Sequence, residues 1–192
     1  VVGRPPSLCK GCPHIYSYNA LNQALETWSK GRVFSDIGCY TLGALEPFNA
    51  INSCVDMGAS ITMAKGAADA GLNPAVAVIG DSTFTHSGIT GLIDCVNDNS
   101  AVTILILDNE TPGMTGGQES AALGRIESIC FGVGVDPNHI ITLNPSPKYH
   151  EENLSAIKRE LDYQGVSVIV PRRECIQTAT RNLNLAKKVK AE

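Results

Sequence analysis

The sequence predicts an α/β protein with a doubly wound, mostly parallel sheet and helices on both faces. Three observations support this prediction. Apolar runs such as residues 75–80 and 101–109 are continuous rather than alternating with polar residues, which is typical of strands buried on both faces. Segments with a helical pattern separate the apolar runs, and strand–helix–strand repetition builds a parallel sheet. The 18 glycines supply the tight turns that such an alternation needs.

The elements are expected in the following order. The pattern over 57–71 predicts a helix that ends at Gly71, because Asn73 and Pro74 stop it. The helical pattern over 87–99 lies between the two most apolar strands. Strands are expected at residues 32–38, 75–80, 101–109, 139–145 and 166–172. Helices are expected at about residues 14–30, 57–71, 87–99 and 149–164.

The length of 192 residues allows one domain with its own core, expected over residues 1–176 and followed by a C-terminal tail at 177–192. The net charge of −4 gives no electrostatic reason to expect nucleic acid or a membrane surface as a partner. No apolar run approaches the ~18 residues of a membrane span. Seven cysteines without a secretory signal predict free thiols in a reducing cytoplasm.

Polar residues follow two neighbouring strands of the predicted sheet. Asp81 comes directly after the strand at 75–80, and Asn109 ends the strand at 101–109. Neighbouring strands lie ~4.8 Å apart, so a carboxylate and an amide oxygen at these ends can reach one cation. Oxygen ligands of this kind suit Mg²⁺, which also takes phosphate oxygens.

Gly80, Ser82 and Thr83 surround Asp81 and are suited to phosphate, because a helix start offers backbone amides and hydroxyls. No strand is followed by G-x-G-x-x-G, and G-x-x-x-x-G-K-[ST] is absent, so neither a dinucleotide fingerprint nor a P-loop is present. An alternative interpretation is that Asp81 only caps the next helix and that Asn109 is a turn residue.

The spacing of these residues resembles the thiamine-diphosphate motif, which is GDG, about two dozen residues or more, and then N. Here "GDS" at 80–82 is followed by residues 83–108 and then by Asn109. The resemblance implies that Mg²⁺ is bound by the side chains of Asp81 and Asn109 and by the backbone oxygen of Thr111. The ion then holds the diphosphate of the cofactor. Ser82 departs from the second glycine of the motif, at a point where the backbone approaches the cofactor closely.

Four cysteines form a second candidate constellation. Cys9 and Cys12 make a C-x-x-C pair, which by itself is compatible with half a zinc site, a redox pair or no function. Cys39 and Cys175 follow strands, so all four thiols are expected at the same edge of the sheet as Asp81. Four thiolates suit structural zinc or a [4Fe–4S] cluster. The cysteines at 95 and 130 are interpreted as part of the core.

Longer motifs carry a more specific resemblance. The segments "LCKGCPH", "SDIGCYTLGAL", "NAINSCVDMGASITMAKG", "VAVIGDSTFTHSGITGL" and "ILDNETPGMTGGQ" together resemble the thiamine-diphosphate-binding domain of the large subunit of indolepyruvate:ferredoxin oxidoreductases, a branch of the 2-oxoacid:ferredoxin oxidoreductases. The similarity extends from about residue 4 to about residue 176. It implies oxidative decarboxylation of an aryl pyruvate to an acyl-CoA, with thiamine diphosphate and Mg²⁺ as cofactors. It also implies a [4Fe–4S] cluster held by Cys9, Cys12, Cys39 and Cys175, although unmetallated thiols remain an alternative.

The resemblance also implies a task for each nearby segment. His14 is a candidate proton carrier or anion-binding group, with simple hydrogen bonding in a turn as the alternative, and Thr115 is a candidate substrate contact. The other residues expected near the cofactor are Cys12, Gly38, Cys39, Gly58, Ala59, Ser60, Gly80, Asp81, Ser82, Thr83, Asn109, Thr111, Gly113 and Met114.

Partners follow from what the chain does not contain. In the family, a glutamate that activates the cofactor lies on a separate pyrimidine-binding domain, and nothing in this sequence matches that domain. The expected partners are therefore a domain or subunit carrying this glutamate, a ferredoxin-like domain or ferredoxin, the 2-oxoacid and coenzyme A. No turnover is expected from the chain alone. Two other functions remain open: a non-oxidative thiamine-dependent decarboxylase or synthase, and a structural subunit without a cofactor.

Overall fold

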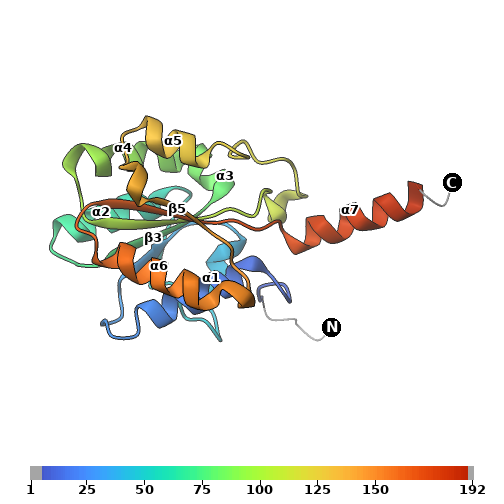
Figure 1. Ribbon diagram of the computed structural model, residues 1–192, viewed down its shortest axis with the longest axis horizontal. Helices are drawn as coiled ribbons and strands as arrows, with labels where there is room; N and C mark the ends of the chain where they lie inside the picture. The colour runs from blue at the N-terminus through green and yellow to red at the C-terminus, as the bar shows by residue number, and fades with distance from the viewer. Residues whose placement is uncertain (1–5, 190–192) are drawn as a thin grey trace.

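A six-stranded sheet, in which all paired strands are parallel, forms the centre of the computed structural model, which describes residues 6–189 (Figure 1). The strand order is β2-β1-β3-β4-β6-β5, so β3 and β4 are central, with β1 and β2 on one side and β6 and β5 on the other. The strands are β1 (Val33–Ser35), β2 (Ser53–Cys54), β3 (Ala75–Gly80), β4 (Val102–Leu107), β5 (Ile140–Leu143) and β6 (Val166–Pro171). The predicted fold class is confirmed. Residues 1–5 of the expected domain and 190–192 of the expected tail lie outside the described residues.

Helices cover both faces of the sheet (Figure 1). The helices α1 (Pro13–Ala24) and α6 (His150–Asp162) pack on one face, and α2 (Ala59–Asp69), α4 (Ile89–Asp98) and α5 (Ile126–Gly132) pack on the other. All six residues of β3 and of β4 are buried. Ala77 and Ile79 of β3 face the core beneath α2 and α4, whereas Val76 and Val78 face the core beneath α1 and α6. Burying each large aliphatic side chain in this way stabilises the fold by about 1.5–3 kcal/mol.

The register of the two central strands sets the position of the site. Gly80, the last residue of β3, lies opposite Leu107, the last residue of β4. The chain segments that follow the two strands therefore leave the sheet side by side at one edge. This edge is where ligands bind in open parallel sheets.

The helix after β3 begins earlier than the sequence pattern predicts. A short helix α3 (Asp81–Thr83) starts immediately after the strand, continues as a π-helical turn η2 (Phe84–Gly88) and leads into α4. The predicted start at residue 87 was wrong, because Ser82, Thr83 and Thr85 hide the helical pattern of this first stretch. Helical turns of the π type frequently occur at functional sites.

Three elements were not predicted. Strand β2 has only two residues and α5 only seven, so neither gives a measurable period. The third is α7 (Ile176–Val189), which extends away from the body of the domain (Figure 1). Leu183 and Leu185 of α7 are 63% and 54% exposed, so its pattern does not reflect packing against the core. Among residues 6–189, no helix has the length and apolarity needed to cross a bilayer.

Candidate functional site

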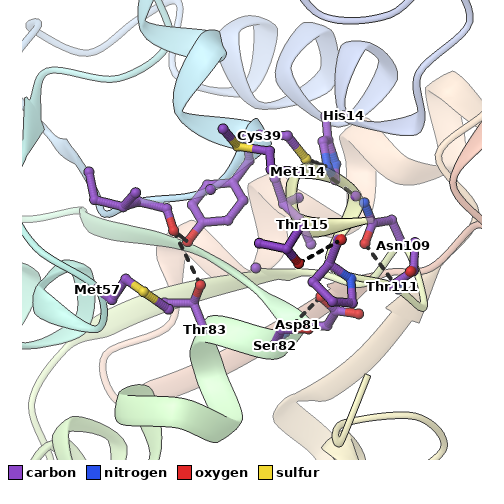
Figure 2. A pocket seen from close by; sticks show the side chains of 17 residues that line it. His14, Cys39, Met57, Asp81, Ser82, Thr83, Asn109, Thr111, Met114 and Thr115 are labelled. Atoms are coloured by element: carbon purple, nitrogen blue, oxygen red, sulfur yellow. Dashed lines mark hydrogen bonds between the residues drawn. The ribbon is translucent and has the colours of Figure 1, made fainter. Parts of the chain in front are cut away.

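A cavity of about 240 Å³ opens at the carboxyl ends of β1, β3 and β4 (Figure 2). Its walls come from the start of α1, the turn after β1, the junction of β3 and α3, and the loop that follows β4. The residues predicted for the site that line this cavity are His14, Gly38, Cys39, Gly80, Asp81, Ser82, Thr83, Asn109, Thr111, Gly113, Met114 and Thr115. Ile37, Tyr40, Met57, Leu107 and Pro112 complete the lining and were not predicted.

Asp81 presents one carboxylate oxygen without a partner to this region. Gly80 is the N-cap of the helix, so Asp81 is its first residue rather than its cap. Its Oδ1 accepts a hydrogen bond of 2.7 Å from the amide of Ser82. Its Oδ2 is buried and has no hydrogen-bond partner among the residues that the structure describes. A buried carboxylate oxygen in this state is costly unless a cation approaches it.

The pKa of Asp81 reflects this environment. Burial raises it from the ordinary 3.8 to about 6, and the hydrogen bond from the Ser82 amide opposes this rise. The nearby charge of Asp108 raises it further. A divalent cation would reverse the effect of burial by compensating the charge directly.

Asp108, the other carboxylate at this edge, is already paired. Its Oδ2 lies 2.5 Å from Nε of Arg172, which also lies 2.7 Å from Glu127. The side chain of Asp108 is only 1% exposed, so the ion pair compensates a buried charge. Within residues 6–189, no basic side chain forms a hydrogen bond or an ion pair with Asp81.

Asn109 and Thr111 line the same cavity as the residues at the start of α3 (Figure 2). Between them, Glu110 adopts φ +66°, a conformation unusual for a residue other than glycine, and the resulting tight turn leaves both flanking residues in the cavity wall. Asn109 Oδ1 accepts a 3.4 Å hydrogen bond from the Thr111 amide. A carboxylate, an amide oxygen and a backbone carbonyl together make a donor set suited to Mg²⁺.

Tyr40 forms the floor of the cavity, and glycine is required on both sides of its ring. A Cβ atom at Gly38 would lie 2.2 Å from Cε1 of Tyr40, and one at Gly80 would lie 2.4 Å from the same atom. The phenol hydroxyl donates a hydrogen bond to the carboxylate of Asp36. The ring therefore holds the turn after β1 against the end of β3.

Asp36 organises the wall behind Tyr40. Its Oδ2 accepts hydrogen bonds from the Gly58 amide at 3.1 Å and from Ser60 Oγ at 2.6 Å. Burial raises the pKa of Asp36, and these donors oppose the rise. Gly58, Ala59 and Ser60 consequently lie behind the cavity, and Met57 is the residue of this segment that lines it. The signal that could have identified Asp36 is the one that identified Asp81, a carboxylate directly after a buried strand.

His14 contributes an uncharged imidazole to the wall. Burial lowers its pKa to about 4, so the ring is neutral at neutral pH. Its Nε2 lies 3.4 Å from Sγ of Cys39, and its ring meets Tyr40 edge-on with centroids 6.4 Å apart. A neutral imidazole can both donate and accept a hydrogen bond, which suits a group that moves a proton.

The hydroxyls of Ser82 and Thr83 both donate hydrogen bonds near the start of the helix. Ser82 Oγ donates to Ser120 Oγ at 3.0 Å, and Thr83 Oγ1 donates to the carbonyl of Ile37 at 3.3 Å. Ser120 is 4% exposed and was not predicted. It lies 38 residues from Ser82 in the sequence, so no local pattern could have joined the two.

The four candidate cysteines lie around the base of α1 and the start of α7. Cys9 is exposed, and its Sγ lies 3.4 Å from Nε2 of Gln177. Cys175 donates its amide to the carbonyl of Asn109 at 3.0 Å. Burial raises the pKa of Cys12 to about 11 and that of Cys39 to about 12, so both thiols are protonated at neutral pH. Only Cys39 of the four lines the cavity.

Within residues 6–189, no three side chains of His, Cys, Asp or Glu are grouped as ligands of one metal ion. The ligation of a [4Fe–4S] cluster by Cys9, Cys12, Cys39 and Cys175 stays a prediction. Cys95 and Cys130 are fully buried in the apolar core, as predicted.

Comparisons with known proteins agree with this geometry. Residues 36–170 match the family model described as "Thiamine pyrophosphate enzyme, C-terminal TPP binding domain". The chain is 37% identical over 183 residues to the indolepyruvate oxidoreductase subunit IorA of Archaeoglobus fulgidus, and 36% identical over 198 residues to that of Pyrococcus horikoshii. Each match covers 90% of this chain and 29% of the relative, so the chain spans less than a third of their length.

Solved structures share the fold at low sequence identity. A 2-oxoglutarate:ferredoxin oxidoreductase from Magnetococcus marinus superposes with a TM-score of 0.72 at 18% identity, over 90% of this chain and 65% of that one. The benzoylformate decarboxylase of Polynucleobacter necessarius gives a TM-score of 0.60 at 19% identity, over 80% of this chain and 32% of that one. The family match extends over most of the sheet and over every segment that follows β1, β3 and β4 in the cavity wall. The chain belongs to the family of C-terminal thiamine-pyrophosphate-binding domains of thiamine pyrophosphate enzymes.

Proposed function

We propose that this chain binds the diphosphate of thiamine diphosphate through Mg²⁺, which is held by Asp81, Asn109 and the backbone carbonyl of Thr111. The observation that carries the proposal is the buried Oδ2 of Asp81, which has no hydrogen-bond partner among the described residues. Asp108, close by, is already neutralised by Arg172. The ion would therefore bind at the carboxylate whose charge is not compensated.

The residues around Asp81 orient the cofactor. Gly80 keeps the end of β3 against the ring of Tyr40, which fills the space where a Cβ would lie. Ser82 and Thr83 add hydroxyls at the start of the helix, where phosphate is favoured. When bound, thiamine diphosphate supplies the electron sink that allows a bond next to the carbonyl of a 2-oxoacid to break.

The proposed substrate is a 2-oxoacid, with an aryl pyruvate as the preferred class. The side chains of Ile37, Met57, Leu107 and Met114 give the cavity apolar walls that suit an aromatic group. The matched relatives are named indolepyruvate oxidoreductases, which supports the same class. We propose that His14 moves a proton at its ring nitrogen and that Thr115 contacts the substrate.

We propose that the reaction is oxidative and that it needs partners. These are a pyrimidine-binding domain or subunit with the activating glutamate, a ferredoxin-like domain or ferredoxin, and coenzyme A. The match covers only 29% of the length of the relative from Archaeoglobus fulgidus. The rest of such a protein is long enough to contain domains of this kind. The seven cysteines are free thiols, which supports a cytoplasmic location. The [4Fe–4S] ligand set of Cys9, Cys12, Cys39 and Cys175 stays a prediction that analysis of iron and sulfide under anaerobic conditions tests.

A non-oxidative thiamine-dependent decarboxylase is the second candidate function. The fold is shared with a benzoylformate decarboxylase, so the fold alone favours neither reaction. The thiols of Cys12, which is buried, and of Cys39, which is half-buried and lines the cavity, favour redox chemistry only if they bind iron. An iron-free protein that releases an aldehyde from a 2-oxoacid would support the non-oxidative reaction.

Calorimetric titration with thiamine diphosphate tests the proposal. The intact protein with its partner subunits is titrated in Mg²⁺ and again in EDTA. We expect binding in Mg²⁺ only, and its loss in Asp81→Asn. The matched control is Asp162→Asn, the same change at an exposed position at the end of α6. Equal binding by Asp81→Asn and the control would overturn the proposed function.

A further inference from the structure

The loop at residues 112–118, called here the cofactor-side loop, forms one wall of the cavity and contains Met114 and Thr115. It closes on itself through the amides of Thr115 and Gly117, which both donate to the carbonyl of Pro112 at 3.3 and 3.2 Å. Most of its residues are exposed, and Met114 is 70% exposed. Few apolar contacts therefore hold this wall in place, and its position depends on polar contacts.

Arg181 of α7 supplies two of these contacts. Its Nη1 donates to the carbonyl of Gly116 at 2.7 Å, and its Nη2 donates to the carbonyl of Gly117 at 2.9 Å. The two donors of one planar guanidinium thus bind two successive carbonyls of the loop. A lysine has a single ammonium group and does not reproduce this planar two-donor geometry.

The two glycines fit this contact. Gly116 and Gly117 adopt φ +116° and +70°, which turns their carbonyls out of the loop. A Cβ at Gly117 would lie 3.1 Å from Nη2 of Arg181 and 3.2 Å from Oγ1 of Thr178. The loop therefore packs its bare backbone directly against one face of α7.

The base of α7 is also tied to the site. The amide of Cys175, the residue before the helix, donates to the carbonyl of Asn109 at 3.0 Å. A Cβ at Gly113 would lie 3.7 Å from Sγ of Cys175, so this end of the loop contacts the same residue. The helix α7 as a whole extends away from the body of the domain (Figure 1). The helix is thus joined to the cavity wall at its base and at Arg181.

We propose that Arg181 is a positioning residue that holds the cofactor-side loop against the site, so that the placement of α7 sets the position of Met114 and Thr115. This inference rests on the proposed function in one respect, which is that the loop faces a bound cofactor. The contact between Arg181 and the loop is independent of any ligand.

Hydrogen exchange of the intact chain, followed by mass spectrometry, tests the inference. In Arg181→Ala we expect the amides of Thr115 and Gly117, which donate to the carbonyl of Pro112, to exchange roughly tenfold faster, because the loop loses two hydrogen bonds from a charged donor. The effect is confined to the loop, whereas global destabilisation would also speed exchange in β3 and β4. Arg181→Lys restores protection only in part. The control is Lys187→Ala, which removes a positive charge from an exposed position further along α7.

A second variant keeps the inference testable if Arg181→Ala does not fold. Gly117→Ala leaves Arg181 in place but brings a Cβ within 3.1 Å of its Nη2 and strains a residue at φ +70°, and it should speed exchange in the same amides. The affinity of the intact protein for thiamine diphosphate should fall roughly tenfold in Arg181→Ala as well. Unchanged exchange in residues 113–118, or faster exchange with unchanged affinity, would overturn the inference. A wild-type chain that binds no thiamine diphosphate would instead refute the proposed function, while the exchange rates still decide the role of Arg181.

Discussion

Replacing Asp81 by asparagine should stabilise the chain in the absence of cofactor. Burial raises the pKa of Asp81 from 3.8 to about 6. Each tenfold change in proton affinity corresponds to about 1.4 kcal/mol, so the ionised carboxylate costs the fold about 3 kcal/mol at pH 7. Asparagine keeps the shape and removes the charge. We expect Asp81→Asn to recover part of this free energy of unfolding, in a position where most substitutions would destabilise.

The effect should depend on pH with a defined sign. The pKa of Asp81 is higher in the folded chain than in the unfolded one, so the folded state binds the proton more tightly. The stabilisation from the protonated form is fully present below about pH 4 and is lost as the pH rises through about 6. The difference between Asp81→Asn and the wild type should therefore be small at pH 4 and largest above pH 6.

Thermal unfolding in EDTA at several pH values measures this difference. For a domain of this size, each kcal/mol shifts Tm by roughly 2–4 °C. Asp81→Asn should melt several degrees above the wild type at pH 7, and Asp162→Asn should match the wild type. Adding thiamine diphosphate and Mg²⁺ should raise the Tm of the wild type and of Asp162→Asn, but not that of Asp81→Asn. A variant that is less stable than the wild type at every pH would refute the view that Asp81 is an uncompensated charge.

Two further predictions concern the walls of the cavity. Gly38→Ala should destabilise the chain by about 1–3 kcal/mol in denaturant unfolding, because its Cβ meets the ring of Tyr40. Gly66→Ala, on a helix with nothing near the new Cβ, should instead stabilise it by about 0.5–1 kcal/mol, and equal effects would contradict the packing described. Alkylation at pH 8, read by mass spectrometry, should modify exposed Cys9 well before Cys39, whose pKa burial raises to about 12. Equal rates would show that the thiol of Cys39 is open to solvent.

The sequence was sufficient to predict five of the six strands and one side of the site. A continuous apolar run flanked by turn residues predicts a buried strand. The polar residues that follow such a run are therefore expected at the carboxyl edge of the sheet. Asp81 and Asn109 could be found for this reason, since Asp81 directly follows β3 and Asn109 lies two residues after the end of β4. The pairing of β3 with β4 then places Asp81 and Asn109 at the same edge of the sheet. This placement follows from the order of the strands and needs no contact between distant side chains.

The rest of the site depends on contacts between distant segments. Tyr40 packs against Gly80, and Ser120 accepts a hydrogen bond from Ser82, although neither pair has a local pattern. The helix α7 is polar and exposed, so its sequence resembles that of a solvated tail. The role proposed for α7 rests on the contact of Arg181 with the cofactor-side loop, which the sequence does not indicate.

Anomalous diffraction with Mn²⁺ in place of Mg²⁺, on crystals of the intact protein grown with thiamine diphosphate, tests the central claim most directly. The account predicts an anomalous peak within roughly 2.0–2.3 Å of Asp81 Oδ2, with Asn109 and the carbonyl of Thr111 as further ligands. A cofactor whose diphosphate lies elsewhere, or a metal peak away from Asp81, would contradict it.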